Sequence, residues 1–247
     1  MKLNYILHLA DNALILGHRL SEWCGHGPVL EQDMAMTNIA LDLVGQSRNL
    51  YQYAAKIDGQ EKEEDHYAYF RDAIDFKNLL LVEQENGDFA KTVLRQFFYD
   101  AYNYHLYSHL LKSKDESLAA IAEKSIKEIT YHLRWSAEWV IRLGDGTEES
   151  AKRTNKALEE LWPFTGEIFL PADYEKEAAQ QGYGVNPNTL KADWEKEVKH
   201  IFAEAKIKYP EEAWMQKGGK TGRHTEKLGY ILADMQFLQR AYPGQKW

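Results

Sequence analysis

The chain has 247 residues, of which 44% are hydrophobic and 28% are charged, and this composition excludes an intrinsically disordered protein. A formal net charge of −8 makes nucleic acid an unexpected partner, because an acidic surface repels the phosphate backbone. The single cysteine, Cys24, excludes an internal disulfide, and no apolar run reaches the ~20 residues that span a bilayer, so we expect a cytoplasmic protein without membrane contact.

The first part of the chain contains four long stretches with the hydrophobic spacing of helices. These helices are expected over residues 4–23, 28–57, 88–112 and 113–144. Pro28 stands at a first helical position, and Ser113 followed by Glu116 predicts a capping box at the start of the fourth helix. Residues 61–86 are less regular and are expected to hold short helices.

The second part of the chain predicts three further helices. A fifth helix is expected from Thr147 to Trp162, and it is followed by connecting structure over residues 163–188. A sixth helix is expected from about Thr189 to just before Pro210, and a last helix from His224 to Ala241. Strand patterns are nearly absent, and short turns between long helices favour antiparallel neighbours, so the predicted fold class is all-α.

Polar side chains follow one face of each of the four long helices when the residues are projected at about 100° per residue. From the first helix to the fourth, the aligned sets are Asp11, His18 and Glu22; Asn38, Asp42, Gln46, Asn49 and Tyr53; Gln96, Asp100, Asn103 and Tyr107; and Ser125, Glu128 and His132. Ferritin-like proteins hold two metal ions between four such helices. We therefore predict a single ferritin-like helical domain over residues 1–247, with a core bundle at about 4–144 and C-terminal helices at about 147–247.

The predicted metal ligands are incomplete. Two ferritin-like helices normally present Glu-x-x-His, but Gly45 stands three residues after Asp42, and Tyr131 stands three residues after Glu128. His132 comes one residue late, which turns its imidazole by about 100° around the helix axis. A polar stripe on any one helix could also be a solvated face. We predict no catalytic residue and no metal ligand, and instead a degenerate former metal site or buried polar network: Glu22, Asp42, Asp100, Glu128 and His132.

Several long stretches of the chain resemble one known family. They read "SEWCGHGPVLEQDMAMTNIALDLVGQSRNLY", "NLLLVEQENGDFA", "KEITYHLRWS" and "GGKTGRHTEKLGYILADMQFLQRAYPGQKW". From Asp11 to Trp247, the chain is similar to the C-subunit family of the ring-1,2-phenylacetyl-CoA epoxidases, which act in phenylacetate catabolism. The resemblance implies a ferritin-like subunit that lacks the iron ligands and scaffolds a homologous di-iron catalytic subunit.

The same resemblance implies the cofactors and partners. This chain is expected to be catalytically inactive and to hold no cofactor, while the di-iron centre lies in the partner subunit. A flavin and iron–sulfur reductase component would supply electrons from NADPH to the full complex, and a homodimer of the isolated chain is left open. Aromatic residues favour a large interface, but the sequence does not decide which of four contribute: Trp135, Trp139, Trp214 and Trp247.

Two hypotheses of other classes compete with this one. The first is a self-sufficient di-metal carboxylate oxidoreductase with a non-standard ligand set formed by the five polar residues above. The second is a small-molecule or CoA-ester binding module with a regulatory role, in which the basic stretch "KGGKTGRH" (Lys217, Lys220 and Arg223) meets phosphate groups. For this stretch, a solvated loop is the more ordinary interpretation.

Overall fold

The structure is a computed structural model that describes residues 1–211 and 213–245. Within these residues all regular secondary structure is helical, so the predicted all-α class is confirmed. The α-helices are α1 (Lys2–Ser21), α2 (Leu30–Asp58), α3 (Glu64–Tyr69), α4 (Phe89–Leu110), α5 (Glu116–Gly144), α6 (Glu148–Leu161), α7 (Asp173–Gln181), α8 (Lys191–Glu204) and α9 (Glu226–Ala241). Short 3-10 turns are η1 (Ala73–Asp75), η2 (Trp162–Phe164), η3 (Gly166–Phe169), η4 (Pro187–Leu190) and η5 (Gly219–Thr221).

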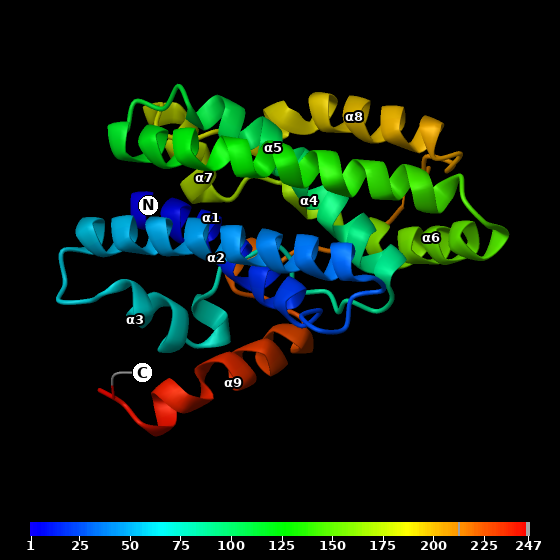
Figure 1. Cartoon of the computed structure of the whole chain (residues 1–247). Coiled ribbons are helices and arrows are strands. Elements are labelled where there is room, and N and C mark those ends of the chain that lie inside the picture. The colour runs from blue at the N-terminus through cyan, green and yellow to red at the C-terminus, as the bar shows by residue number, and fades with distance from the viewer. Residues whose placement is uncertain (212, 246–247) are drawn as a thin grey trace.

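The four long predicted helices are present as α1, α2, α4 and α5. Helix α1 packs along α2, α4 packs along α5, and α2 also contacts α5, as Figure 1 shows. α8 lies against α4 and α5, whereas α9 lies at the opposite edge beside α3. Helix α1 is buried along most of its length, and each of its fully buried leucine and isoleucine side chains contributes about 1.5–3 kcal/mol of hydrophobic stabilisation.

Helix ends follow the capping rules, although not always at the predicted residue. The predicted capping box at Ser113 is wrong, because Asp115 is the N-cap of α5 and accepts a hydrogen bond from the Leu118 amide. The Ser113 hydroxyl instead donates to the carbonyl of Tyr183 and so joins α5 to the turn after α7. Gly59 closes α2 in the left-handed region at φ 65°, where a glycine has no steric penalty.

Residues 163–188 were predicted as connecting structure, and this prediction is wrong for their middle part. They contain the nine-residue helix α7, which buries Tyr174 and Ala178 and packs on α1. Its buried positions span little more than one turn, so the sequence gives no sustained helical period. Gly182, at φ 80°, ends the helix.

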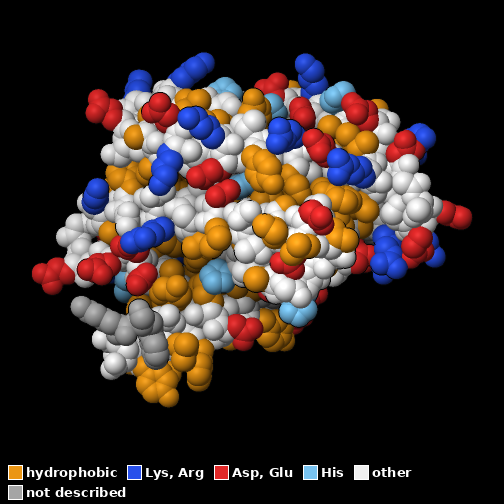
Figure 2. Space-filling model, viewed as in Figure 1, with side chains coloured by type: hydrophobic (Ala, Val, Ile, Leu, Met, Phe, Trp, Pro, Cys, Tyr) orange, Lys and Arg blue, Asp and Glu red, His pale blue; other side chains and the backbone are white. Residues whose placement is uncertain are grey.

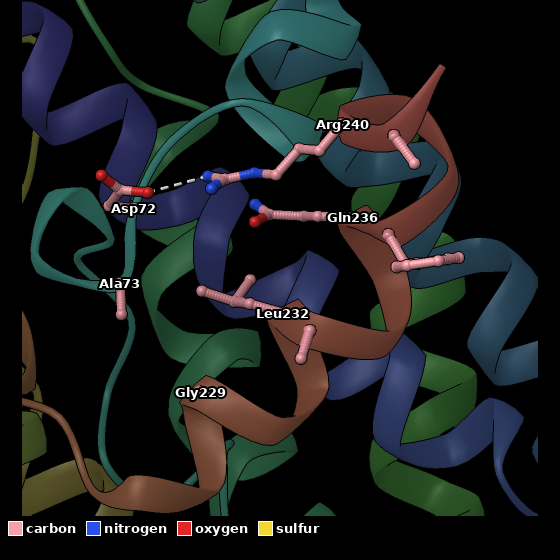
Figure 3. Close-up of a pocket in the computed structure, with 9 residues that line it drawn as sticks. Asp72, Ala73, Gly229, Leu232, Gln236 and Arg240 are labelled. Atoms are coloured by element: carbon pink, nitrogen blue, oxygen red, sulfur yellow. Dashed lines mark hydrogen bonds and ion pairs between the residues drawn. The ribbon is translucent and has the colours of Figure 1, made fainter. Parts of the chain in front are cut away.

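Helix α9 closes the edge of the molecule next to α3. The Gln236 side chain donates to the carbonyls of Ala68 and Arg71, and Arg240 forms an ion pair with Asp72 at 2.9 Å. Figure 3 shows the shallow pocket between α9 and the η1 turn, which is lined by the side chains of Asp72, Gln236, Arg240 and Leu232. None of the helices in the described residues combines the length and the apolar composition of a membrane span.

Candidate functional site

Four of the five predicted polar residues lie on α2, α4 and α5, and each has a hydrogen-bond partner there. The Nε2 of His132 on α5 lies 3.0 Å from the Oδ2 of Asp42 on α2, which forms a cross-helix pair. One turn away on the same two helices, the Gln46 amide donates to the Glu128 carboxylate at 2.8 Å. Two side-chain contacts thus join α2 to α5, and both include residues that the sequence analysis assigned to the polar network.

Asp100 on α4 is the most buried acid of this network. Its carboxylate accepts hydrogen bonds from Gln96 on α4 at 2.7 Å and from Ser136 on α5 at 2.8 Å. Burial raises the pKa of Asp100 to about 6, although the charge of His132 and these two hydrogen bonds oppose the rise. Ionisation of this carboxyl group therefore destabilises the folded chain.

Glu22 does not join the other four residues. Its carboxylate accepts hydrogen bonds from Arg19 at 2.8 Å and from Asn86 at 2.9 Å, and its side chain is 45% exposed. Asp11, which the sequence placed in the same stripe, is fully buried with different partners. The polar stripe predicted for α1 therefore divides between two environments, and α1 supplies no carboxylate to the network of α2, α4 and α5.

The residues of the network do not fit a two-metal centre. Among the described residues, no group of three or more His, Cys, Asp and Glu side chains is arranged to hold a metal ion. A Cβ at Gly45 would meet nothing within 4 Å, and the Tyr131 side chain is 39% exposed, so both positions face outward. Histidines there would point away from Asp42 and Glu128, and the inward positions one residue later are occupied by Gln46 and His132.

Three buried oxygen atoms near the network have no hydrogen-bond partner among the described residues. They are Oε1 of Gln46, Oε1 of Gln96 and Oγ of Ser125. Buried polar atoms of this kind are commonly satisfied by internal water. The region between α2, α4 and α5 is therefore polar and incompletely paired by the described protein groups.

A second buried network, which the sequence did not reveal, surrounds Asp11. Arg71 donates to both carboxylate oxygens of Asp11, at 2.5 and 3.2 Å, and Tyr51 donates to the same group at 2.6 Å. Burial alone would lower the pKa of Arg71, but the Asp11 charge overcomes it and the pKa is raised. Arg71 lies in the irregular stretch before η1, where no periodic pattern could signal that it is buried.

The basic stretch "KGGKTGRH" is partly engaged in contacts within the chain. Lys220 is buried, and its ammonium group contacts the Glu175 carboxylate at 3.0 Å and the carbonyls of Ile168 and Leu170. The amide of Gly218 donates to Glu167 at 2.6 Å. The central lysine of the stretch therefore anchors the segment before α9 to α7 and η3, so one of the three basic side chains is held by protein groups.

His224, at the end of the same stretch, contacts a further buried acid. Its Nδ1 lies 3.7 Å from the Oε1 of Glu83, and its Nε2 lies 3.0 Å from the carbonyl oxygen of Phe76. Burial would lower the pKa of His224, but the neighbouring Glu83 carboxylate raises it. These contacts hold the start of α9 against residues 76–83, so two of the four stretches that carry the family resemblance contact each other.

Comparison with known proteins agrees with this resemblance. The family described as phenylacetic acid catabolic protein matches residues 1–247. The C subunit of the 1,2-phenylacetyl-CoA epoxidase of Escherichia coli (strain K12) is 50% identical over 243 residues, which cover 98% of each chain. The resemblance inferred from the four quoted stretches is confirmed.

Proposed function

The chain belongs to the family of phenylacetic acid catabolic proteins, and we propose from this membership that it is the non-catalytic structural subunit of a 1,2-phenylacetyl-CoA epoxidase. In this role it scaffolds a homologous di-iron catalytic subunit in the cytoplasm, during aerobic phenylacetate catabolism. The proposal rests mainly on 50% identity along nearly the whole length of the Escherichia coli C subunit. It includes a single ferritin-like domain, in which α1, α2, α4 and α5 form the bundle.

The polar network supports a structural rather than a catalytic role. Asp42 pairs with His132, Gln46 with Glu128, and Asp100 with Ser136, so the acids of the network are engaged by protein hydrogen-bond partners. This chain therefore needs no cofactor in the proposed role. The di-iron centre belongs to the partner subunit, and the reductase component delivers electrons to that subunit.

An exposed apolar surface supports association with a partner protein. On α2, the side chains of Leu30, Met34 and Leu41 are exposed, and Tyr131 on α5 is partly exposed. Figure 2 shows hydrophobic side chains gathered over α2 and α5, with charged side chains of both signs around them. Apolar surfaces bordered by polar groups are characteristic of protein–protein interfaces.

Co-purification tests the proposal. The full chain and an affinity-tagged homologous catalytic subunit are produced in the same cells, and we expect them to elute together in a fixed ratio through size-exclusion chromatography. Substituting Leu41→Asp and Met34→Asp should weaken the complex, while the exposed substitution Tyr230→Asp on α9 serves as the matched control. A chain that stays separate from the catalytic subunit at micromolar concentration would contradict the scaffold role.

A further inference from the structure

A pocket with aromatic walls lies between α8 and the η2 and η3 turns. Four aromatic side chains form much of its wall: Trp162, Phe169, Trp194 and Tyr209. Its volume is about 310 Å³, at the small end of the range for ligand pockets. Because a cavity of about 150 Å³ is enough to hold benzene, this pocket has room for one aromatic ring and a short polar group.

The aromatic rings of the wall are held in place by one another and by the core. The ring of Tyr209 meets that of Trp162 edge to face, with centroids 5.1 Å apart. The ring of Phe169 meets that of Trp194 in a similar way at 5.2 Å. The Nε1 of Trp194 also donates to the carbonyl of Phe98 on α4 at 3.0 Å, which fixes the indole. A ligand ring can pack on such a wall in the same edge-to-face geometry, and little side-chain freedom is lost when it does.

One residue of the wall has a hydrogen-bond donor without an acceptor. The Nε1 of Trp162 is buried and makes no hydrogen bond to any described residue. An indole nitrogen only donates, and a buried donor of this kind normally has an oxygen partner. A ligand oxygen supplies that acceptor, which a hydrocarbon or an ammonium ion lacks. A cation is disfavoured for a second reason, because the Lys199 ammonium group already lies 4.9 Å from the centre of the Tyr209 ring.

The charged groups at the mouth of the pocket favour an anion. Lys191 lines the pocket, and it shares the Glu195 carboxylate with Lys199, at 3.8 and 3.6 Å. Glu211 also lines the pocket, and it pairs with Lys208 at 3.3 Å. Among the described charges that line the pocket or pair with its wall, three ammonium groups thus face two carboxylates, although the whole chain has a net charge of −8. The excess positive charge attracts a negative group.

We propose that this pocket binds a small aromatic carboxylic acid. The ring of the ligand packs against the aromatic wall, and its carboxylate accepts hydrogen bonds from the Trp162 Nε1 and from the Lys191 ammonium group. The bound acid contacts α8, the η2 and η3 turns and the segment after α8, so it joins three parts of the chain. This inference does not depend on the proposed function, because the pocket is formed by this chain alone.

Calorimetric titration of the full-length chain with three one-ring probes tests the inference. Phenylacetate carries the carboxylate, phenylacetamide is its neutral counterpart of the same shape, and 2-phenylethylamine carries a cation instead. Phenylacetate should bind one site per chain with a dissociation constant below about 1 mM. Phenylacetamide should bind roughly fivefold more weakly, because it loses an ion pair at the solvent-exposed mouth. The amine should bind most weakly of the three.

Two variants locate the site. Lys191→Met keeps an apolar stem but removes the charge, so it should weaken phenylacetate roughly fivefold and leave phenylacetamide unchanged. Lys196→Met is the matched control, because Lys196 is exposed on the same helix but does not line the pocket. Asn188 lines the pocket and is exposed, so Asn188→Tyr should fill the mouth and abolish the binding of both probes. Unchanged circular dichroism shows that each variant is folded.

Nuclear magnetic resonance tests the contact with Trp162. A carboxylate oxygen that accepts from the Nε1 should shift the indole N–H resonance of Trp162 when phenylacetate is added, and Trp162→Phe identifies that resonance by its loss. The indole resonance of Trp135 is the internal control, because its Nε1 donates to Gln32 between α5 and α2. It should not move.

Four results would overturn this inference. Phenylacetate could show no saturable binding at about 10 mM, the amine could bind as tightly as the acid, Lys191→Met could behave like Lys196→Met, or Asn188→Tyr could leave binding unchanged. Each of these results would leave the proposed function intact, because none involves the catalytic subunit. Conversely, failure of the catalytic subunit to bind this chain would leave the titrations unaffected.

Discussion

Replacing Asp100 by asparagine should stabilise the protein at neutral pH. The carboxyl group has a pKa of about 6 in the folded chain, against an ordinary value of 3.8, and burial is the main cause. Between these values the folded state binds more protons than the unfolded state, so stability falls as pH rises through this window. The difference corresponds to about 3 kcal/mol of unfolding free energy, which is the cost of keeping Asp100 ionised above pH 6.

Asparagine is neutral at every pH and keeps an oxygen that accepts from Gln96, while the Ser136 hydroxyl can turn to accept from the new amide. The free energy of unfolding of Asp100→Asn should exceed that of the wild type by up to about 3 kcal/mol at pH 7, and the two should converge near pH 4. Urea unfolding followed by circular dichroism measures both values.

The control for this experiment is Asp234→Asn, which makes the same change at an exposed position of α9 and should alter stability by no more than about 0.5 kcal/mol. Other titrating groups are common to the wild type and Asp100→Asn and cancel in the difference. If Asp100→Asn were less stable than the wild type at pH 7, the hydrogen bonds to the ionised carboxylate would outweigh its burial, and the reasoning about Asp100 would be refuted.

Two further predictions concern the buried pairs. Arg71→Met should lower the free energy of unfolding by about 3–5 kcal/mol, because it leaves the Asp11 carboxylate buried without its guanidinium partner; an unchanged urea midpoint would contradict this. His224→Gln should lower the free energy of unfolding most below pH 6.5. The pKa of His224 is raised in the folded chain, so the stability from its pairing with Glu83 is lost as the pH rises through that pKa. A cost that grew toward alkaline pH would contradict the pairing.

The sequence predicted the parts of the fold that have a sustained period. The long helices α1, α2, α4 and α5 each contain five or more turns, and a hydrophobic pattern of that length is difficult to mistake. The spacing of residues within a long helix also fixes the face on which each side chain lies. The sequence could therefore predict the helix faces that carry four polar residues: Asp42, Asp100, Glu128 and His132. Helix α7 was missed because its buried positions cover little more than one turn.

The parts that could not be predicted depend on contacts between segments far apart in the sequence. Arg71 reaches Asp11 across 60 residues, and Lys220 reaches Glu175 across 45. Neither cation lies in a periodic helix, so each looked like an ordinary exposed charge in the sequence. The sequence placed Glu22 on the polar face of the first helix. Glu22 lies one residue beyond the end of α1, where it pairs with Arg19 and not with the network.

Metal analysis of this chain, produced without its partners in medium supplemented with iron and manganese, tests the absence of a metal centre most directly. The purified, unchelated protein should contain far less than one metal ion per chain while its circular dichroism shows a fully helical fold. About two metal ions per chain, the content of a complete ferritin-like centre, would contradict the account and require that Asp42, Glu128 and His132 be tested as ligands.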